Sequence, residues 1–294
     1  MCKYSLISLF SGVSGSSLGF HNTGRINELL AVDCDPYVEK CFNLNFPGVP
    51  FWNAFLGKDS GKEILIKTGI QPGYLDILFA SPPCQGFSMA KGSRSISDSR
   101  NDLLVDTIHI IRDIQPKVFI IENVKGLISG EMKMKLNQVL KMIEKIGYIY
   151  AYKVLLASEY GVPQLRERII IMGIRSDIGL KPSFPKPIIV NDLCIKNYVD
   201  DIDFFTSGQF SHNMYTKDEI CRTITATASM KFFKDGIKRD PKIIEIKRLC
   251  SFPEDFILAD ENYDRQYKAL GNSVPPKLME AIANNIINMF NNLK

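Results

Sequence analysis

The sequence predicts an α/β fold with a large parallel-sheet domain and a smaller second domain. Along the first 175 residues, short apolar runs alternate with segments of helical periodicity, the pattern of strands joined by helical crossovers. After that the pattern stops, and Pro182, Pro185 and Pro187 interrupt a stretch that mixes β-prone runs with charge. Helical periodicity returns near residue 262. We therefore expect residues 1–175 and 262–294 to form the larger domain, and 176–261 a small, irregular, β-rich domain with a hinge.

The periodicity places the individual elements. Apolar residues spaced three and four apart predict helices over 103–114 and 132–146, the second ending at Gly147, a residue common after helix ends. A last helix is expected after the sequence GNSVPP, because proline is favoured in the first turn of a helix. Strands of the sheet are expected at 5–10, 29–33, 75–80, 118–122, 150–157 and 168–174.

The composition is that of a globular protein whose excess positive charge is local. Of 294 residues, 45% are hydrophobic and 23% charged, which excludes disordered and fibrous classes. The net charge of +4 excludes a polybasic protein but permits an enzyme with one basic face. Between residues 216 and 248, nine Lys and Arg stand against five Asp and Glu, so this stretch accounts for the whole excess.

Cysteine and histidine usage favours neither a disulfide framework nor a metal site. Seven cysteines, an odd number, include no C-x-x-C pair, and the three histidines are far apart in the sequence. No apolar run approaches the roughly 20 residues that a membrane span needs. We therefore expect a protein without metal or membrane, in the cytoplasm.

A glycine-rich turn follows the first predicted strand. The sequence Phe10-Ser-Gly-Val-Ser-Gly15 joins that strand to a helix, whose first N–H groups can bind a ligand. Asp33, 21 positions after Gly12, ends the next predicted strand, where a carboxylate can accept both hydrogen bonds of a ribose diol. The spacing is not that of a nicotinamide-binding turn. Two interpretations stay open here: a nucleoside cofactor site, or a structural turn beside a surface aspartate.

A thiol and a carboxyl group follow two other predicted strands. Cys84 lies in Ser81-Pro-Pro-Cys-Gln-Gly-Phe-Ser, where two prolines stiffen the chain just before it, and Glu122-Asn-Val ends the next strand. Carboxyl ends of parallel strands meet at one edge of a sheet, where open α/β sheets hold their ligands. The pair fits a nucleophile with an acid partner. For an isolated cysteine, a buried inert thiol is the alternative.

Together these motifs resemble the DNA (cytosine-5)-methyltransferases of prokaryotes and phages. They occur in that family's order: F-x-G, S-P-P-C-Q-G-F-S, E-N-V, Q-x-R-x-R and G-N-S-V-P. The resemblance covers nearly the whole chain and leaves only about 176–211 without a counterpart. It implies a Rossmann-like sheet of the S-adenosylmethionine-dependent methyltransferases with helices on both faces, and a small target-recognition domain. The implied reaction transfers a methyl group from S-adenosyl-L-methionine to carbon 5 of a cytosine flipped out of double-stranded DNA.

The resemblance also assigns catalytic roles by position. Cys84 matches the nucleophile that adds to carbon 6 of the base, and Glu122 the acid that serves ring nitrogen 3. Arg168 would hold the carbonyl oxygen of the base, with Arg166 close by. Arginine charge would also favour the thiolate form of the cysteine.

Cofactor contacts are carried over from the same motifs. Three positions depart from the family pattern: Ser14 replaces a usual glycine, Asp33 a usual glutamate, and Asn53 a usual aspartate that accepts from the adenine amino group. An Asn side-chain oxygen can still accept that bond, so we expect weaker cofactor affinity rather than none. The matching residues are Phe10, Gly12, Gly15, Asp33, Cys34, Asn53, Ala54, Leu103, Asn272, Ser273 and Val274.

DNA contacts are expected from two segments. The segment 88–100 resembles the mobile loop of the family; Gln85, Ser88, Arg94 and Arg100 are the candidates there, and Lys231 and Lys234 in the small domain. The implied partners are double-stranded DNA and a separately encoded restriction endonuclease, with a monomer associated with the nucleoid. Two alternatives stay open: a catalytically silent DNA-binding or regulatory homologue, and a tRNA cytosine-5 methyltransferase.

Overall fold

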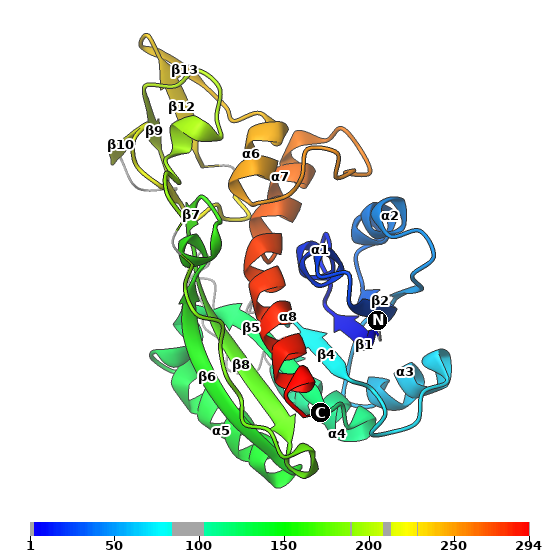
Figure 1. Cartoon of the computed structure of the whole chain (residues 1–294). Helices are drawn as coiled ribbons and strands as arrows, with labels where there is room; N and C mark the ends of the chain where they lie inside the picture. The colour runs from blue at the N-terminus through cyan, green and yellow to red at the C-terminus, as the bar shows by residue number, and fades with distance from the viewer. Residues whose placement is uncertain (1–2, 84–102, 189, 208–212, 228, 294) are drawn as a thin grey trace.

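The computed structural model describes residues 3–83, 103–188, 190–207, 213–227 and 229–293 (Figure 1). Its centre is a seven-stranded sheet of order β3-β2-β1-β4-β5-β8-β6. The strands are β1 (Tyr4–Leu9), β2 (Ile26–Asp33), β3 (Phe51–Asn53), β4 (Ile77–Ala80), β5 (Val118–Val124), β6 (Tyr148–Leu156) and β8 (Glu167–Arg175). All six predicted strands are present. The three-residue β3 was not predicted, because it is too short to show a period.

The predicted parallel pattern holds for β3, β2, β1, β4 and β5, but not for β8. That strand pairs antiparallel with both β5 and β6. The ten residues between β6 and β8 hold only a 3-10 turn (Ala157–Tyr160) and the two-residue strand β7 (Gln164–Leu165). A parallel return needs a crossover of a dozen residues or more, usually a helix, so this short connection makes the chain run back beside itself.

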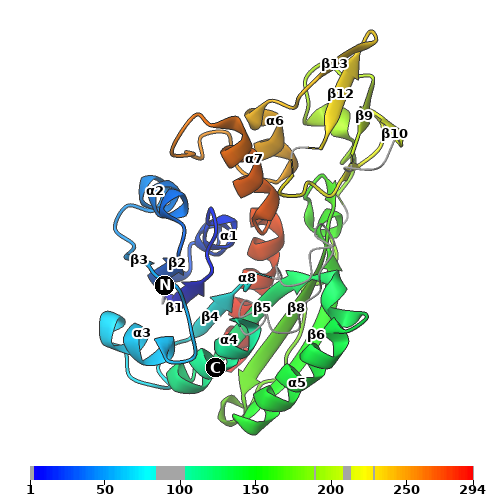
Figure 2. The same ribbon diagram turned by 180° about the vertical axis from the view of Figure 1, so that it is seen from behind.

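Helices cover both faces of this sheet, as the predicted fold class requires. In Figure 1, α8 crosses the front of the sheet, and in Figure 2 it lies behind it. One face packs against α1 (Gly15–Asn22) and α8 (Pro276–Asn291) through Leu6 and its neighbours. The other face packs against α3 (Ser60–Thr68), α4 (Leu103–Ile114) and α5 (Met132–Lys145) through Ile7 and Leu9. Alternation of side chains along β1 thus supplies both cores.

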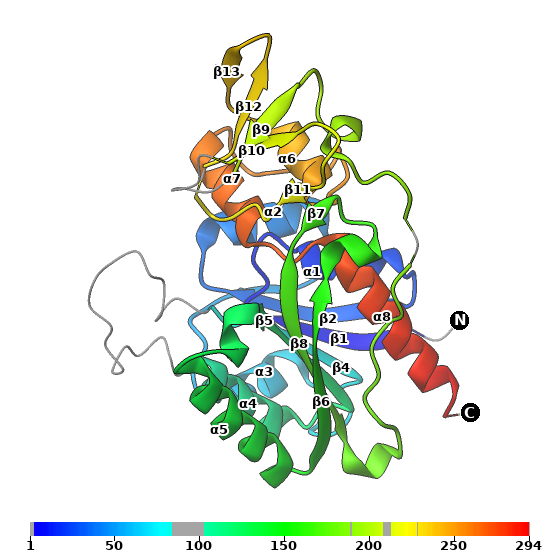
Figure 3. The same cartoon turned by 90° about the vertical axis from the view of Figure 1, so that its left-hand side faces the viewer.

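A second, four-stranded sheet lies above the first in Figure 3, with strand order β10-β9-β12-β13. Its strands are β9 (Phe204–Thr206), β10 (Met214–Thr216), β12 (Lys231–Lys234) and β13 (Ile237–Arg239). A short strand, β11 (Cys221–Arg222), pairs instead with β7 of the larger part. Helix α6 (Ile243–Leu249) packs on α7 (Tyr263–Asn272), one on each side of the predicted boundary at 262. The four strands of the sheet all lie within the predicted small domain, whose exact limits stay a prediction.

The two parts share a core. Side chains from β9, β12, α6 and α7 pack in one cluster with those of α2 (Pro36–Asn45), a helix that flanks the large sheet. Phe205, Phe232, Leu249, Tyr267 and Phe42 are among its buried members. The small sheet is therefore anchored to the large one by apolar packing. None of the described helices is long and apolar enough to span a membrane.

Candidate active site

The carboxyl ends of β4 and β5 bring Ser81 beside Glu122. The strands are parallel and pair Ala80 with Ile121, so the next residues along each strand are neighbours. The Ser81 hydroxyl donates to Glu122 Oε2 at 2.6 Å. Arg168, on β8, places its Nε 2.9 Å from Glu122 Oε1. Both carboxylate oxygens therefore have a partner, in a residue that is only 5% exposed.

The proline turn is fixed to the same edge. Asn123, which is buried, donates from Nδ2 to the carbonyl oxygen of Pro82 at 3.1 Å. This bond attaches the turn before Cys84 to β5. Cys84 itself, with Gln85, Ser88, Arg94 and Arg100, lies outside the described residues. The predicted acid, Glu122, therefore lies beside Ser81, and Ser81 is among the last described residues before the predicted nucleophile, Cys84.

Arg166, predicted to lie close to Arg168, is buried among backbone carbonyl groups. It is 2% exposed and donates to the carbonyl oxygens of Ile224 at 2.9 Å, Gly271 at 3.0 Å and Ser273 at 2.9 Å. Burial, and then the positive charge of Arg168, lower the pKa of Arg166 to about 9. These contacts join the chain between β7 and β8 to the segment that follows β11 and to the GNSV segment. The geometry is that of a side chain that positions other residues.

The glycine-rich turn and the end of β2 are joined through Asp33. The backbone N–H of Gly12 donates to Asp33 Oδ2 at 2.9 Å, and that of Asp35 to Oδ1 at 3.1 Å. Burial raises the pKa of Asp33, while these backbone donors act in the opposite direction. Ser14, just before α1, is buried in a left-handed conformation (φ 69°). That backbone conformation explains why glycine suits this position.

Asn53 lies beside Asp33, at the end of the neighbouring strand. The register of β2 and β3 pairs the two residues directly. The Asn53 Nδ2 group donates to Glu39 Oε2 at 2.9 Å, and Glu39 lies in the first turn of α2. The backbone N–H of Ala54 donates to the carbonyl oxygen of Asp33 at 3.0 Å. The residues predicted to bind the adenine and the ribose, Asn53 and Asp33, are therefore adjacent. Asn53 has a further partner, Glu39, that no sequence signal indicated.

The GNSV segment packs against the start of α1. A Cβ atom added to Gly15 would lie 2.1 Å from the carbonyl oxygen of Val274, so only glycine permits this contact. Ser273 is buried, and its hydroxyl donates to the carbonyl oxygen of Leu270 at 2.7 Å. This contact brings the C-terminal predicted cofactor residues to the N-terminal ones, although more than 250 positions separate them in the sequence. Of the remaining candidates, Cys34 is exposed, while Phe10 and Leu103 are half-buried.

The donors and acceptors present here fit S-adenosylmethionine. The carboxylate of Asp33 suits a ribose diol, and the amide oxygen of Asn53 suits an adenine amino group. The first N–H groups of α1 favour an anionic group such as a carboxylate. Phe10, packed against the sheet core, provides an apolar contact beside them.

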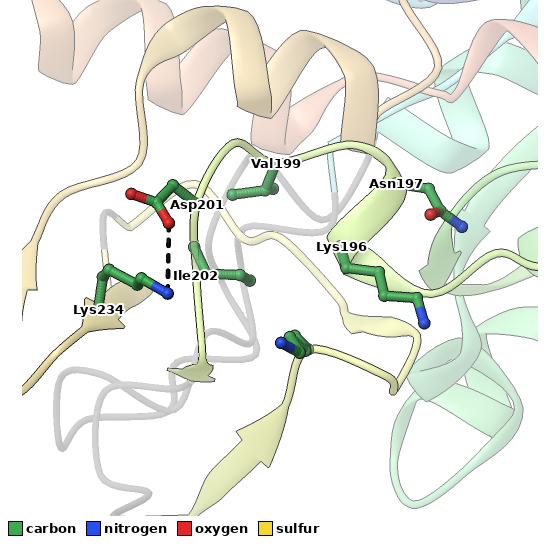
Figure 4. Close-up of a pocket in the computed structure, with 7 residues that line it drawn as sticks. Lys196, Asn197, Val199, Asp201, Ile202 and Lys234 are labelled. Carbon is green, nitrogen blue, oxygen red and sulfur yellow. Dashed lines mark ion pairs between the residues drawn. The ribbon is translucent and has the colours of Figure 1, made fainter.

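The two predicted DNA-binding lysines of the small domain are engaged with acids. Lys231 forms an ion pair with Asp240, and Lys234 with Asp203 at 3.2 Å and Asp201 at 3.4 Å. Lys234 also lines a pocket of about 330 Å³ in this domain (Figure 4). Three lysines line this pocket, but acids partly neutralise them; Lys196, for example, pairs with Asp218 at 2.7 Å. None of the residues predicted for the active site lines it.

One further ion pair lies at the start of α6. Glu245 is fully buried and accepts from Arg239 Nη1 at 2.8 Å, from Arg239 Nη2 at 2.7 Å and from the backbone N–H of Lys242 at 2.7 Å. It thereby caps α6 and ties that helix to the end of β13.

The chain is similar in sequence to known methyltransferases. A model of the C-5 cytosine-specific DNA methylases matches residues 4–232 and 188–288. The type II methyltransferase M.SsoII of Shigella sonnei is 29% identical, covering 97% of this chain and 80% of that protein. M.BsuRI of Bacillus subtilis is 30% identical, with the same coverage of both chains.

Solved structures share the fold. A putative DNA modification methyltransferase encoded within an E. coli prophage has a TM-score of 0.78 at 20% identity, covering 98% of this chain and 100% of that one. A mutant of DNMT2 from Spodoptera frugiperda has a TM-score of 0.75 at 18% identity, covering 97% and 100%.

The fold and its strand-edge site define an S-adenosylmethionine-dependent methyltransferase. Within that class, the chain belongs to the C-5 cytosine-specific DNA methylase family. The predicted fold class, cofactor and enzyme class are thereby confirmed, and DNA is the substrate class of the family.

Proposed function

We propose that the protein methylates carbon 5 of a cytosine that is flipped out of a specific double-stranded DNA sequence. In this reaction Cys84 is the nucleophile, Glu122 is the acid, and Arg168 holds the carbonyl oxygen of the base. The observation that carries this proposal is the Glu122 carboxylate, held on one oxygen by Ser81 and on the other by Arg168, next to the turn that leads to Cys84. Flipping is required because the nucleophile approaches from above the ring plane, which the stack blocks in a duplex.

The proposed methylation passes through a covalent bond between Cys84 and the base. The thiolate of Cys84 forms a bond to carbon 6, and the electron pair of the 5,6 double bond shifts towards ring nitrogen 3, which takes a proton from Glu122. Carbon 5 then takes the methyl group that S-adenosylmethionine would supply, and the sulfur keeps the electron pair of the broken bond as S-adenosylhomocysteine. Loss of the carbon 5 proton to water and return of the nitrogen proton to Glu122 expel the thiolate and restore the ring.

Ser81 is suited to this proton movement. A hydroxyl can donate to a carboxylate and can equally accept from a carboxylic acid, so it remains a partner of Glu122 in both protonation states. An arginine can only donate, so Arg168 stays on Oε1 throughout. Among the described residues, no group accepts from Arg168 Nη2, which leaves that donor for the carbonyl oxygen of the base.

We assign Arg166 to positioning. One of its three carbonyl partners, Ile224, lies just after β11, and the other two, Gly271 and Ser273, lie in the GNSV segment. We further propose that Phe10, Gly12, Gly15, Asp33, Asn53 and the GNSV segment bind the cofactor, as their adjacency supports.

The small domain and the segment containing Arg94 and Arg100 would contact the DNA. Lys231 and Lys234 would have to exchange their acidic partners for phosphates, so their contribution depends on that exchange. We also propose that the protein acts as a monomer on chromosomal DNA in the cytoplasm, and that a separately encoded restriction endonuclease accompanies it. The type II names of its relatives support the last point.

Labelled S-adenosylmethionine tests the function directly. The protein is incubated with duplex DNA or with tRNA, and bisulfite sequencing of DNA from expressing cells locates the modified cytosine. We expect label on duplex DNA only, and Cys84→Ala to abolish transfer while retaining cofactor binding within about threefold. Label on neither nucleic acid would indicate a silent homologue, and label on tRNA alone would indicate the RNA enzyme; either result overturns the proposal.

A further inference from the structure

Glu39 and Asn53 form a hydrogen-bonded pair at the rim of the cofactor site. Glu39 comes from the first turn of α2, whose cap is Asp35 accepting from the N–H of Tyr37 at 2.8 Å. Asn53 ends β3, directly beside Asp33 of β2. The bond runs from Asn53 Nδ2 to Glu39 Oε2 at 2.9 Å. A helix and a strand that are themselves well fixed therefore hold both partners in place.

A carboxylate partner determines which way the amide of Asn53 faces. The amide has a donor end and an acceptor end of nearly the same shape, whereas an ionised carboxylate can only accept. Glu39 therefore holds the Nδ2 end, and Oδ1 is presented on the other side of the amide plane. Among the described residues no group donates to Asn53 Oδ1, so this acceptor is open to a ligand.

We propose that Glu39 is a positioning residue that makes this site selective for a purine with an amino group at carbon 6. The proposal rests on the proposed function, in which Asn53 faces the adenine of the cofactor. An amino group at that carbon donates and needs an acceptor, which Oδ1 provides. A hypoxanthine carries an oxygen there and needs a donor, but the bond to Glu39 turns Nδ2 towards the glutamate and Oδ1 towards the base. An unrestrained asparagine could turn over and bind either base.

The pair also explains why an asparagine can stand where an aspartate is usual. An aspartate accepts only and needs no partner to set its direction. Placed at position 53, however, it would bring a second carboxylate against Glu39 within hydrogen-bonding distance, a repulsive arrangement. An asparagine at position 53 with a glutamate at position 39 can therefore present an acceptor to the adenine amino group. An aspartate at position 53 with a neutral partner can do the same.

Equilibrium binding tests the proposal without turnover. The probes are S-adenosylhomocysteine and S-inosylhomocysteine, in which an oxygen replaces the adenine amino group, and the dissociation constants are measured by calorimetry. We expect the wild-type protein to prefer the adenosyl compound by about tenfold or more, the value of one well-placed hydrogen bond. In Glu39→Gln the preference should fall to within about threefold, mainly through tighter inosyl binding, because a glutamine there can accept from Asn53 or donate to it.

Two further variants sharpen the result. The double variant Asn53→Asp with Glu39→Gln should regain the wild-type preference, because the carboxylate at position 53 can only accept. Glu63→Gln, the same charge change in the first turn of α3, should leave the preference unchanged. A wild-type preference retained in Glu39→Gln overturns the role of Glu39. Failure of the wild-type protein to bind S-adenosylhomocysteine overturns instead the cofactor site of the proposed function.

Discussion

Arg168 Nε lies 2.9 Å from Glu122 Oε1, an ion pair that joins the last parallel strand of the sheet to its antiparallel neighbour. The register pairs Val124 with Arg168, so the arginine lies two positions past Glu122 along the edge and its side chain reaches back. Because β8 runs against β5, it delivers a cation near its beginning to the place where β5 delivers a carboxylate near its end. Reversal of one strand thus completes the site.

Glu122→Gln should lower kcat by a factor on the order of 10² to 10⁴, because an amide keeps the shape but cannot give a proton to the base. Binding of S-adenosylhomocysteine should stay within about threefold of wild type, since the predicted cofactor residues are separate. Single-turnover methylation of duplex DNA and calorimetric binding provide the two measurements. A kcat within threefold of wild type would remove Glu122 from the chemistry.

Ser81→Ala should lower kcat about tenfold and leave KM for DNA within about twofold. The variant removes the hydroxyl that holds Glu122 Oε2, a loss worth about 1.4 kcal/mol. Ser81→Thr keeps the hydroxyl and should recover most of the activity, which a purely structural role for the small side chain would not predict. Steady-state kinetics across pH 6 to 9 should show the pH profile changed in the alanine variant and restored in the threonine variant.

Arg166→Met should destabilise the protein by about 3 kcal/mol. Three buried carbonyl oxygens lose their donors, at about 1 kcal/mol or more each, and loss of the desolvation cost of the buried cation offsets part of this effect. Urea unfolding followed by circular dichroism measures the change. Arg166→Lys should recover less than half of it, because one ammonium group cannot reach three acceptors in the planar arrangement of a guanidinium. Unchanged stability in the methionine variant would contradict the anchoring role.

Ser14→Gly should stabilise the protein by about 0.5 to 1 kcal/mol. The left-handed backbone at φ 69° costs a serine roughly 1 to 2 kcal/mol, which exceeds the entropy that glycine loses on folding. Among the described residues, its hydroxyl donates only to the carbonyl oxygen of Gly12, over a long distance of 3.4 Å. Ser16→Gly is the matched control: it lies inside α1 and should destabilise by about 0.5 kcal/mol. Thermal unfolding of both variants gives the comparison, and a lower Tm for Ser14→Gly would contradict it.

Tyr148→Phe should make the free energy of unfolding fall less steeply as the pH rises above 10. Burial raises the pKa of Tyr148 above its ordinary value of 10.0, and its hydroxyl donates to the carbonyl oxygen of Pro116 at 2.6 Å. Above pH 10 the unfolded chain loses this proton while the folded chain keeps it, so stability falls as the pH rises. The slope should become shallower in the variant by up to about 1.4 kcal/mol per pH unit. Urea titrations from pH 8 to 11.5 test this; identical slopes would contradict it.

The order of the motifs and the periodicity of the segments determine most of the large domain. The helix expected over 103–114 has those bounds in the structure, because its apolar stripe is clear and strong local periodicity needs no tertiary information. The same local patterns place Asp33 and Glu122 at strand ends, where open α/β sheets bind ligands. The family could be inferred from the five motifs and their order.

Only the tertiary structure decided which side chains meet. The direction of β8 follows from a short connection, the depth of Arg166 from packing of three distant segments, and the Glu39–Asn53 bond from a strand too short to recognise. Sequence periodicity reports which face of an element is buried, since burial repeats along one element. Hydrogen bonds between elements depend on the register and crossing of separate segments, which no single segment encodes. The motifs of this protein therefore predict its chemistry. Only the packing of its helices and strands determines which side chains meet.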